Sequence, residues 1–139
     1  MITINSIKES DYQEIIQLWN NQPGIGIHHI DDSYDGFLVF LHRNPQTCFV
    51  VKSQNKIIGT LLAGYDGRRV TLYHVMIDEA YQGQGIARRL VLHTIKQLRK
   101  LKITKVNLVV YKDNQLGNAF WEKMNFKIRD DLYYRDLIL

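Results

Sequence analysis

One stretch in the second half of the chain decides the fold, because in it an apolar strand runs into a glycine-containing turn that opens a helix. It reads Val75-Met76-Ile77-Asp78-Glu79-Ala80-Tyr81-Gln82-Gly83-Gln84-Gly85-Ile86-Ala87-Arg88. Glycine adopts positive φ readily and lets a ligand approach the backbone closely. The first turn of a helix presents unpaired N–H groups and the positive end of the helix dipole. The pattern therefore has two interpretations, a tight strand-to-helix turn or an anion-binding site.

Two arginines, Arg88 and Arg89, fall in the first turn of the expected helix. Cations at this end of a helix are unfavourable by about 0.3–1 kcal/mol each, and a bound anion would offset that cost. Neither common nucleotide loop is present. The chain has no Gly-x-x-x-x-Gly-Lys sequence, and Arg88 stands where the third glycine of the Gly-x-Gly-x-x-Gly pattern belongs.

Outside this stretch, hydrophobic periodicity and turn signals predict the remaining elements. The expected strands cover residues 2–6, 47–53, 56–64, 70–77 and 105–111, with one or two more in 126–139. The expected helices run from Ser10 or Asp11 to Asn20, from residues 31–33 to before Pro45, from 84 to about 101, and from 118 to 124. This order predicts one α+β domain over residues 1–139, built around a mixed sheet.

The composition is that of an ordinary globular chain, with 139 residues, 45% hydrophobic and 23% charged. The lone Cys48 cannot form an internal disulfide, which favours a reducing compartment, and we read it as a core residue. No apolar run approaches the roughly 18 residues of a membrane span, and the first ten residues lack a signal-peptide core. We therefore expect a cytoplasmic protein without a membrane partner.

Charge is distributed unevenly along the chain. Residues 80–112 contain eight lysines and arginines and no acidic residue, although the net charge of the whole chain is only +4. Such a segment indicates either an anionic partner or a solvated helix face. No aromatic residue interleaves the basic residues before Tyr111, so a stacking platform for nucleic acid is not evident and nucleic acid is not the expected partner.

Several motifs in order resemble the GNAT superfamily of N-acetyltransferases. Gln82 to Ala87 fits the superfamily pattern Arg/Gln-x-x-Gly-x-Gly/Ala, and the segment 118–126 is similar to Ala-x-x-Phe/Leu-Tyr-Glu-Lys-x-Gly-Phe. Asn114 stands seven residues before Trp121, as the family's asparagine stands before its tyrosine. The resemblance covers nearly the whole chain. It implies a mixed, mostly antiparallel sheet of six to seven strands with about four helices.

The resemblance also implies acetyl-CoA as cosubstrate and no metal. In the family the main chain of the fourth strand binds the pantetheine arm, and the turn after that strand binds the pyrophosphate. Asn114 would either bind pantetheine or cap the following helix. The residues assigned to the cosubstrate are Val75, Met76, Ile77, Gln82, Gly83, Gln84, Gly85, Ile86, Ala87, Arg88, Asn114 and Trp121.

The catalytic groups depart from the family pattern. Trp121 replaces the tyrosine that protonates the departing thiolate, and an indole N–H only donates a hydrogen bond. The glutamate base of some members is absent, because Thr71 or Val109 stands in its place. Substitute candidates are His74 as proton acceptor and Tyr111 or Tyr134 as acid. Each of the three also has a second interpretation, as a residue packed in the fold. For His74, alternation along the strand predicts that it shares one face of the sheet with Met76, while Tyr73 and Val75 lie on the other face.

The expected function is transfer of an acetyl group from acetyl-CoA directly to a primary amine of a small molecule or protein. The alternative is a catalytically weak CoA-binding regulatory module. In the family, the region between the first two helices shapes the acceptor pocket. In this chain that region is residues 24–35. Its aspartates, Asp31, Asp32 and Asp35, either attract a cationic amine or cap the following helix. We expect a monomer or homodimer, and the pair His28-His29 alone does not indicate a metal site.

Overall fold

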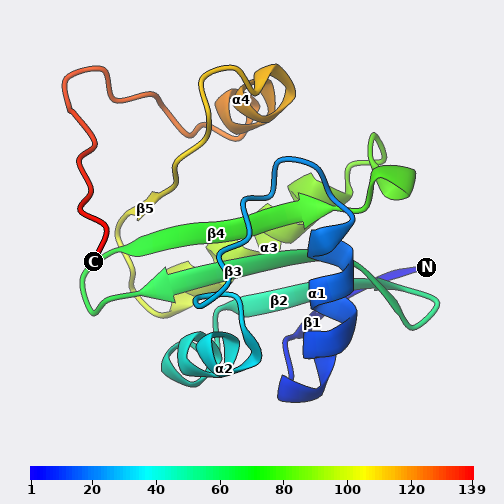
Figure 1. Ribbon diagram of the computed structural model, residues 1–139. Coiled ribbons are helices and arrows are strands. Elements are labelled where there is room, and N and C mark those ends of the chain that lie inside the picture. Colours follow the sequence, from blue (N-terminus) through cyan, green and yellow to red (C-terminus); the bar gives the residue numbers. More distant parts are fainter. The chain divides into compact units, whose positions relative to one another are not determined.

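The computed structural model describes residues 1–139, which divide into two compact units, Met1–Leu108 and Val109–Leu139. The first unit contains a five-stranded sheet in the order β1-β2-β3-β4-β5. Its neighbours are antiparallel except for the parallel pair β4 and β5, so the sheet is mixed as expected (Figure 1). The strands are β1 (Ile2–Ser6), β2 (Cys48–Ser53), β3 (Lys56–Tyr65), β4 (Val70–Ile77) and β5 (Val106–Asn107).

Three α-helices and two short 3₁₀ helices complete the first unit. They are η1 (Glu9–Asp11), α1 (Tyr12–Asn20), α2 (Tyr34–Arg43), η2 (Glu79–Tyr81) and α3 (Ile86–Lys100). The hydroxyl of Ser33 accepts a hydrogen bond from the N–H of Gly36 and caps α2, which ends before Pro45 as predicted. Figure 1 shows α1 and α2 on one face of the sheet and α3 on the other.

Both faces of the sheet are therefore covered, and the strands in its middle are buried on both sides. Residues 57–63 of β3 are all buried, which explains their nearly continuous apolar sequence. Trp19 and Ile15 of α1 and Phe37 of α2 pack into the core on one face. Cys48 lies in this core as expected, and burial raises the pKa of its thiol to about 12, so it is not a nucleophile at neutral pH.

The pairing of β3 with β4 contains a β-bulge. Thr60 pairs with Met76 and Leu62 pairs with Tyr73, so β4 carries one extra residue, and His74 has a φ of +47°. The expected alternation is wrong at this point. Tyr73 packs against Phe40 of α2 at 5.6 Å between ring centroids, and the adjacent His74 also faces the helices. The bulge turns two consecutive side chains to the same face.

The sheet has five strands, not the six to seven expected, and four α-helices, as expected. The strand predicted for residues 105–111 is reduced to Val106–Asn107, and residues 126–139 form none. These segments have the β-branched and aromatic residues that favour strands. A strand also requires a hydrogen-bonded neighbour, and residues 108–111 and 126–139 have no such pairing.

The second unit contains α4 (Gln115–Lys123). Asn114 caps this helix, since its Oδ1 accepts a hydrogen bond of 2.9 Å from the N–H of Gly117, which confirms one of its two interpretations. Trp121 packs against the rings of Phe120 and Phe126, each at 4.9 Å between centroids. A single domain over both units stays a prediction. No helix in the chain has the length and apolar character needed to cross a membrane.

Candidate active site

The glycine turn, residues 82–88, follows β4 and η2 and includes the first residues of α3. Asp78 starts η2, where its Oδ1 accepts from the N–H of Ala80 at 3.0 Å. The side-chain amide of Gln82 donates to the carbonyl of Ile77 at 2.9 Å and ties the turn to the end of the strand. Gly83 and Gly85 have φ of +80° and +76°, and Gly85 is the N-cap of α3. Both glycines thus occupy conformations that other residues rarely adopt.

The main-chain N–H groups of residues 83–88 donate no hydrogen bond to any protein group. The start of α3 also has no side-chain cap and no acidic residue in its first turn, whereas α2 and α4 are capped by Ser33 and Asn114. The exposed Arg88 and Arg89 lie here instead. A Cβ built on Gly83 or Gly85 would meet no atom within 4 Å, so the space beside the turn is open. The arrangement fits a bound diphosphate, which would accept these hydrogen bonds and offset the arginine charge.

An open strand edge leads to this turn. On its side away from β3, β4 pairs with β5 only at Val70 and Thr71. The main chain from Leu72 to Ile77 therefore has no strand partner on that side. Met76 is a core residue with 7% of its surface exposed, so only its main chain could contact a ligand there. An extended ligand could add along this edge by main-chain hydrogen bonds.

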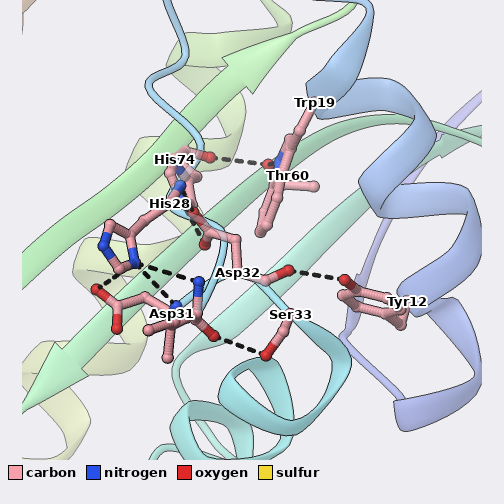
Figure 2. Close-up of polar contacts among 9 residues, drawn as sticks. Tyr12, Trp19, His28, Asp31, Asp32, Ser33, Thr60 and His74 are labelled. Atoms are coloured by element: carbon pink, nitrogen blue, oxygen red, sulfur yellow. Dashed lines mark hydrogen bonds and ion pairs between the residues drawn. The ribbon is translucent and has the colours of Figure 1, made fainter.

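On the α1 and α2 side of the bulge, His74 meets a carboxylate from the α1–α2 loop, residues 21–33. Its Nε2 lies 2.9 Å from Oδ1 of Asp32, and the two side chains are only 16% and 11% exposed (Figure 2). Oδ2 of Asp32 accepts from the main-chain N–H of His28 at 2.8 Å. Burial acts to raise the pKa of the Asp32 carboxyl, but the hydrogen bonds from His74 and His28 outweigh it and lower that pKa. Asp32 is therefore ionised at neutral pH.

Three further residues hold this pair in place. The hydroxyl of Thr60 on β3 accepts from the indole N–H of Trp19 at 2.9 Å and donates to the carbonyl of His74 at 2.8 Å. The Trp19 and His74 rings are 4.4 Å apart at their centroids. The Tyr12 hydroxyl donates to the carbonyl of Asp32 at 2.7 Å, and burial together with the Asp32 charge raises the pKa of that hydroxyl. Figure 2 shows the resulting network between α1, the loop, β3 and β4.

A cavity of about 950 Å³ lies beside this network, lined by part of the α1–α2 loop, by α2 and by His74 and Tyr73. Its volume is in the range of small-molecule sites. Besides Asp32, its wall contains the carboxylates of Asp31, Asp35 and Asp66 and the guanidinium of Arg43. As the family resemblance implied, residues between the first two helices line a pocket.

In the neighbouring pair His28-His29, the ring nitrogen Nδ1 of His28 is engaged by the main chain of the loop. Nδ1 of His28 accepts hydrogen bonds from the N–H groups of Ile30 and Asp31, at 3.3 and 3.1 Å. A nitrogen that accepts from the main chain is unprotonated, so its 3.5 Å approach to the Asp31 carboxylate is not an ion pair in this state. His28 instead serves the local structure of the loop.

The family assignment follows from a match of residues 12–126 to the acetyltransferase (GNAT) family. The chain belongs to this family. It is 26% identical over 137 residues to an acetyltransferase of Sodalis glossinidius, an alignment that covers 93% of this chain and 89% of that protein. An acetyltransferase of Photorhabdus laumondii is 28% identical over 130 residues, covering 91% and 87% of the two chains.

Solved structures confirm the GNAT fold. The crystal structure of PaiA N-acetyltransferase from Thermoplasma acidophilum in complex with coenzyme A superposes with a TM-score of 0.85 at 19% identity, covering 94% of this chain and 92% of that one. An acetyltransferase structure with acetyl-CoA from Clostridium acetobutylicum has a TM-score of 0.81, also at 19% identity, over 98% and 96% of the two chains.

The residues expected at the site of this GNAT member fall in both units. The first unit contains His74, the β4 edge 75–77 and the glycine turn. Asn114, Trp121, Tyr111 and Tyr134 belong to the second unit, and their contacts with a ligand stay predictions. Tyr111 and Tyr134 are about three-quarters exposed, at 74% and 75%. Sequence reasoning missed the pairing of Asp32 with His74, and the only available signal was that Asp32 lies in the expected pocket segment.

The Asp32 carboxyl makes the stability of this GNAT member depend on pH. A carboxyl whose pKa is lower in the folded state stabilises the fold above its unfolded pKa of about 3.9, and this contribution disappears as the pH falls through the folded value. We expect Asp32→Asn to lower the free energy of unfolding at neutral pH, and we expect this loss to shrink as the pH falls below about 4. Urea unfolding at a series of pH values measures this, and a difference that does not change in acid contradicts it.

Proposed function

We propose that this GNAT member transfers the acetyl group of acetyl-CoA directly to a primary amine. The observation that carries the proposal is the start of α3. There the main-chain N–H groups of residues 83–88 have no protein partner, and the first turn contains Arg88 and Arg89 but no side-chain cap and no acidic residue. A diphosphate suits that end of the helix. The family membership and the coenzyme A and acetyl-CoA bound in the two similar structures support the same ligand.

The residues of the chain divide the binding of the cosubstrate between them. The N–H groups of the glycine turn would bind the diphosphate, and the main chain of Val75, Met76 and Ile77 would bind the pantetheine arm along the open edge of β4. Asn114 and Trp121 are assigned to the cosubstrate by the family pattern. When bound, acetyl-CoA supplies an activated acyl carbon and a thiolate leaving group.

His74 and one tyrosine carry out the proton transfers of the reaction. The amine nitrogen forms a C–N bond with the acyl carbon, the C–S bond breaks, and its electron pair leaves with sulfur. His74 accepts the proton that the amine loses, and the hydroxyl of Tyr111 or Tyr134 donates a proton to sulfur. His74 suits its role because it lines the cavity and is held by Asp32. A main-chain N–H on the β4 edge would stabilise the oxyanion that forms during attack.

The cavity beside His74 is the proposed acceptor site. Four aspartates against one arginine give its wall a net negative charge, and Asp32 is committed to His74. The remaining charge favours an amine that arrives as a cation. A loop tied to β4 through Asp32 would also keep the acceptor next to the acyl carbon, where orientation lowers the barrier.

Calorimetry and a thiol-release assay test the proposal. We expect coenzyme A to bind, and acetyl-CoA to release free thiol with at least one member of a panel of diamines, amino acids, aminoglycosides and peptide N-termini. Binding of coenzyme A without thiol release for any amine in the panel would contradict the proposed enzymatic activity and favour a regulatory module. Absence of binding would contradict the whole proposal.

A further inference from the structure

The bond between His74 and Asp32 determines which nitrogen of the imidazole carries the proton. A carboxylate only accepts hydrogen bonds, and the lowered pKa of Asp32 keeps it ionised at neutral pH. Nε2, at 2.9 Å from Oδ1, must therefore be the N–H donor. In the neutral ring Nδ1 then holds the lone pair.

That lone pair is free. No hydrogen bond joins Nδ1 of His74 to another protein group. No buried side-chain nitrogen or oxygen in the chain lacks a partner, so Nδ1 is accessible to solvent rather than enclosed. His74 lines the 950 Å³ cavity, where a ligand could approach it. The ring thus combines a fixed, nearly buried donor side with an accessible acceptor.

We propose that Asp32 is a positioning residue that holds the proton of His74 on Nε2, so that Nδ1 accepts the proton of the acceptor amine. This inference rests on the proposed acetyl transfer. It gives the α1–α2 loop a part in the reaction, because the residue that sets the tautomer belongs to the segment that forms the cavity. The proton moves from the amine nitrogen to Nδ1 as the C–N bond forms, while Asp32 stays ionised and stabilises the imidazolium.

The titratable groups around the pair do not compete for this bond. Tyr12 of α1 reaches only the carbonyl oxygen of Asp32, at 2.7 Å. His28 of the loop donates its main-chain N–H to Oδ2, and its ring nitrogen Nδ1 accepts from the N–H of Asp31. The groups on α1 and β3 that touch His74 are the ring of Trp19 and the hydroxyl of Thr60, which do not titrate near neutral pH.

Asparagine at position 32 is a sharp test, because both oxygens of the carboxylate accept. Oδ1 accepts from His74 and Oδ2 from the N–H of His28. The amide of asparagine has one acceptor oxygen and one donor NH₂. The main-chain N–H of His28 cannot give up its proton, so the oxygen stays there and the NH₂ turns to His74. Nε2 must then become the acceptor, which moves the proton to Nδ1 and removes the base.

The experiment compares wild type with Asp32→Asn, free of ligands, by ¹⁵N NMR of the histidine rings. In the neutral ring of His74 we expect an unprotonated Nδ1 in wild type and an unprotonated Nε2 in the variant. Asp32→Ala, which offers neither partner, should give a mixture. Glu9→Gln is the matched control, since His42 and Glu9 form a similar 2.7 Å contact at the surface, and it should leave the His74 signals unchanged.

Activity provides the second measurement. We expect Asp32→Asn to lower kcat by about 100-fold or more, as loss of a positioned base does. The KM for acetyl-CoA should stay within about twofold, a split that general misfolding would not produce. Glu9→Gln should keep the wild-type kcat. A tautomer that does not invert, or an inverted tautomer with wild-type kcat, overturns the role of Asp32. No thiol release by wild type overturns the proposed function instead, whatever the spectra show.

Discussion

Replacement of Gly85 by valine should weaken coenzyme A binding by about 100-fold, which corresponds to about 2.7 kcal/mol. Gly85 has a φ of +76°, a conformation that a β-branched residue avoids. The side of Gly85 that a Cβ would occupy contains no protein atom within 4 Å, so the new side chain would fill space that we assign to the diphosphate. It would also tilt the N–H groups that open α3. Isothermal titration calorimetry measures the change.

Gly67 offers a matched control. It lies in the hairpin turn between β3 and β4, has a φ of +94°, and likewise has no atom within 4 Å of a built Cβ. Gly67→Val introduces comparable backbone strain away from the proposed site, so its free energy of unfolding should fall as for Gly85→Val. Its affinity for coenzyme A should equal that of wild type. Equal weakening by both variants would attribute the loss to strain, and no weakening by Gly85→Val would refute the diphosphate site.

Removal of the His74 imidazole should lower kcat by about 10²–10³-fold, within the range for a lost general base. Glycine is the suitable replacement, because it accepts the φ of +47° found at this position and leaves room for a small molecule. Coenzyme A affinity should change little, because we assign the cosubstrate to the glycine turn and to the main chain of residues 75–77, and the substitution removes only the side chain of His74. Added imidazole should restore part of the rate if the ring acts as a base.

His42→Gly serves as the control for His74→Gly. His42 is also a histidine next to a carboxylate, but its side chain is 63% exposed and does not line the cavity. We expect an unchanged kcat at high acetyl-CoA concentration and no response to imidazole. A His74→Gly enzyme with wild-type kcat, or one whose lost activity imidazole never restores at any pH, would assign proton transfer to another group.

Five of the eight basic residues in the segment 80–112 lie on α3. Its charged residues on α3 are exposed, and the N-terminal pair, Arg88 and Arg89, adjoins the glycine turn. Along the same helix His93 packs edge-on against Phe49, and burial, with the nearby Lys100 and Lys96, lowers the pKa of its ring. The helix therefore presents a cationic face, and the N-terminal end of that face adjoins the proposed diphosphate site.

Local chemistry made much of the fold predictable. The sequence determined β4 at residues 70–77, the end of α2 before Pro45, and the glycine turn that opens α3. Each of these features depends on a residue and its immediate neighbours in the chain, through proline geometry, glycine freedom or burial of an apolar run.

Tertiary structure alone decided the chemistry at the bulge. Asp32 and His74 are 42 residues apart, and their contact depends on how α1 and its loop pack over the sheet. The extra residue in β4 appears only in its register with β3, so alternation along one strand could not place Tyr73 and His74 on the same face. The number of strands likewise depended on pairing. A hydrogen bond between distant segments requires both to be in place, and the pattern of either segment alone does not contain that information.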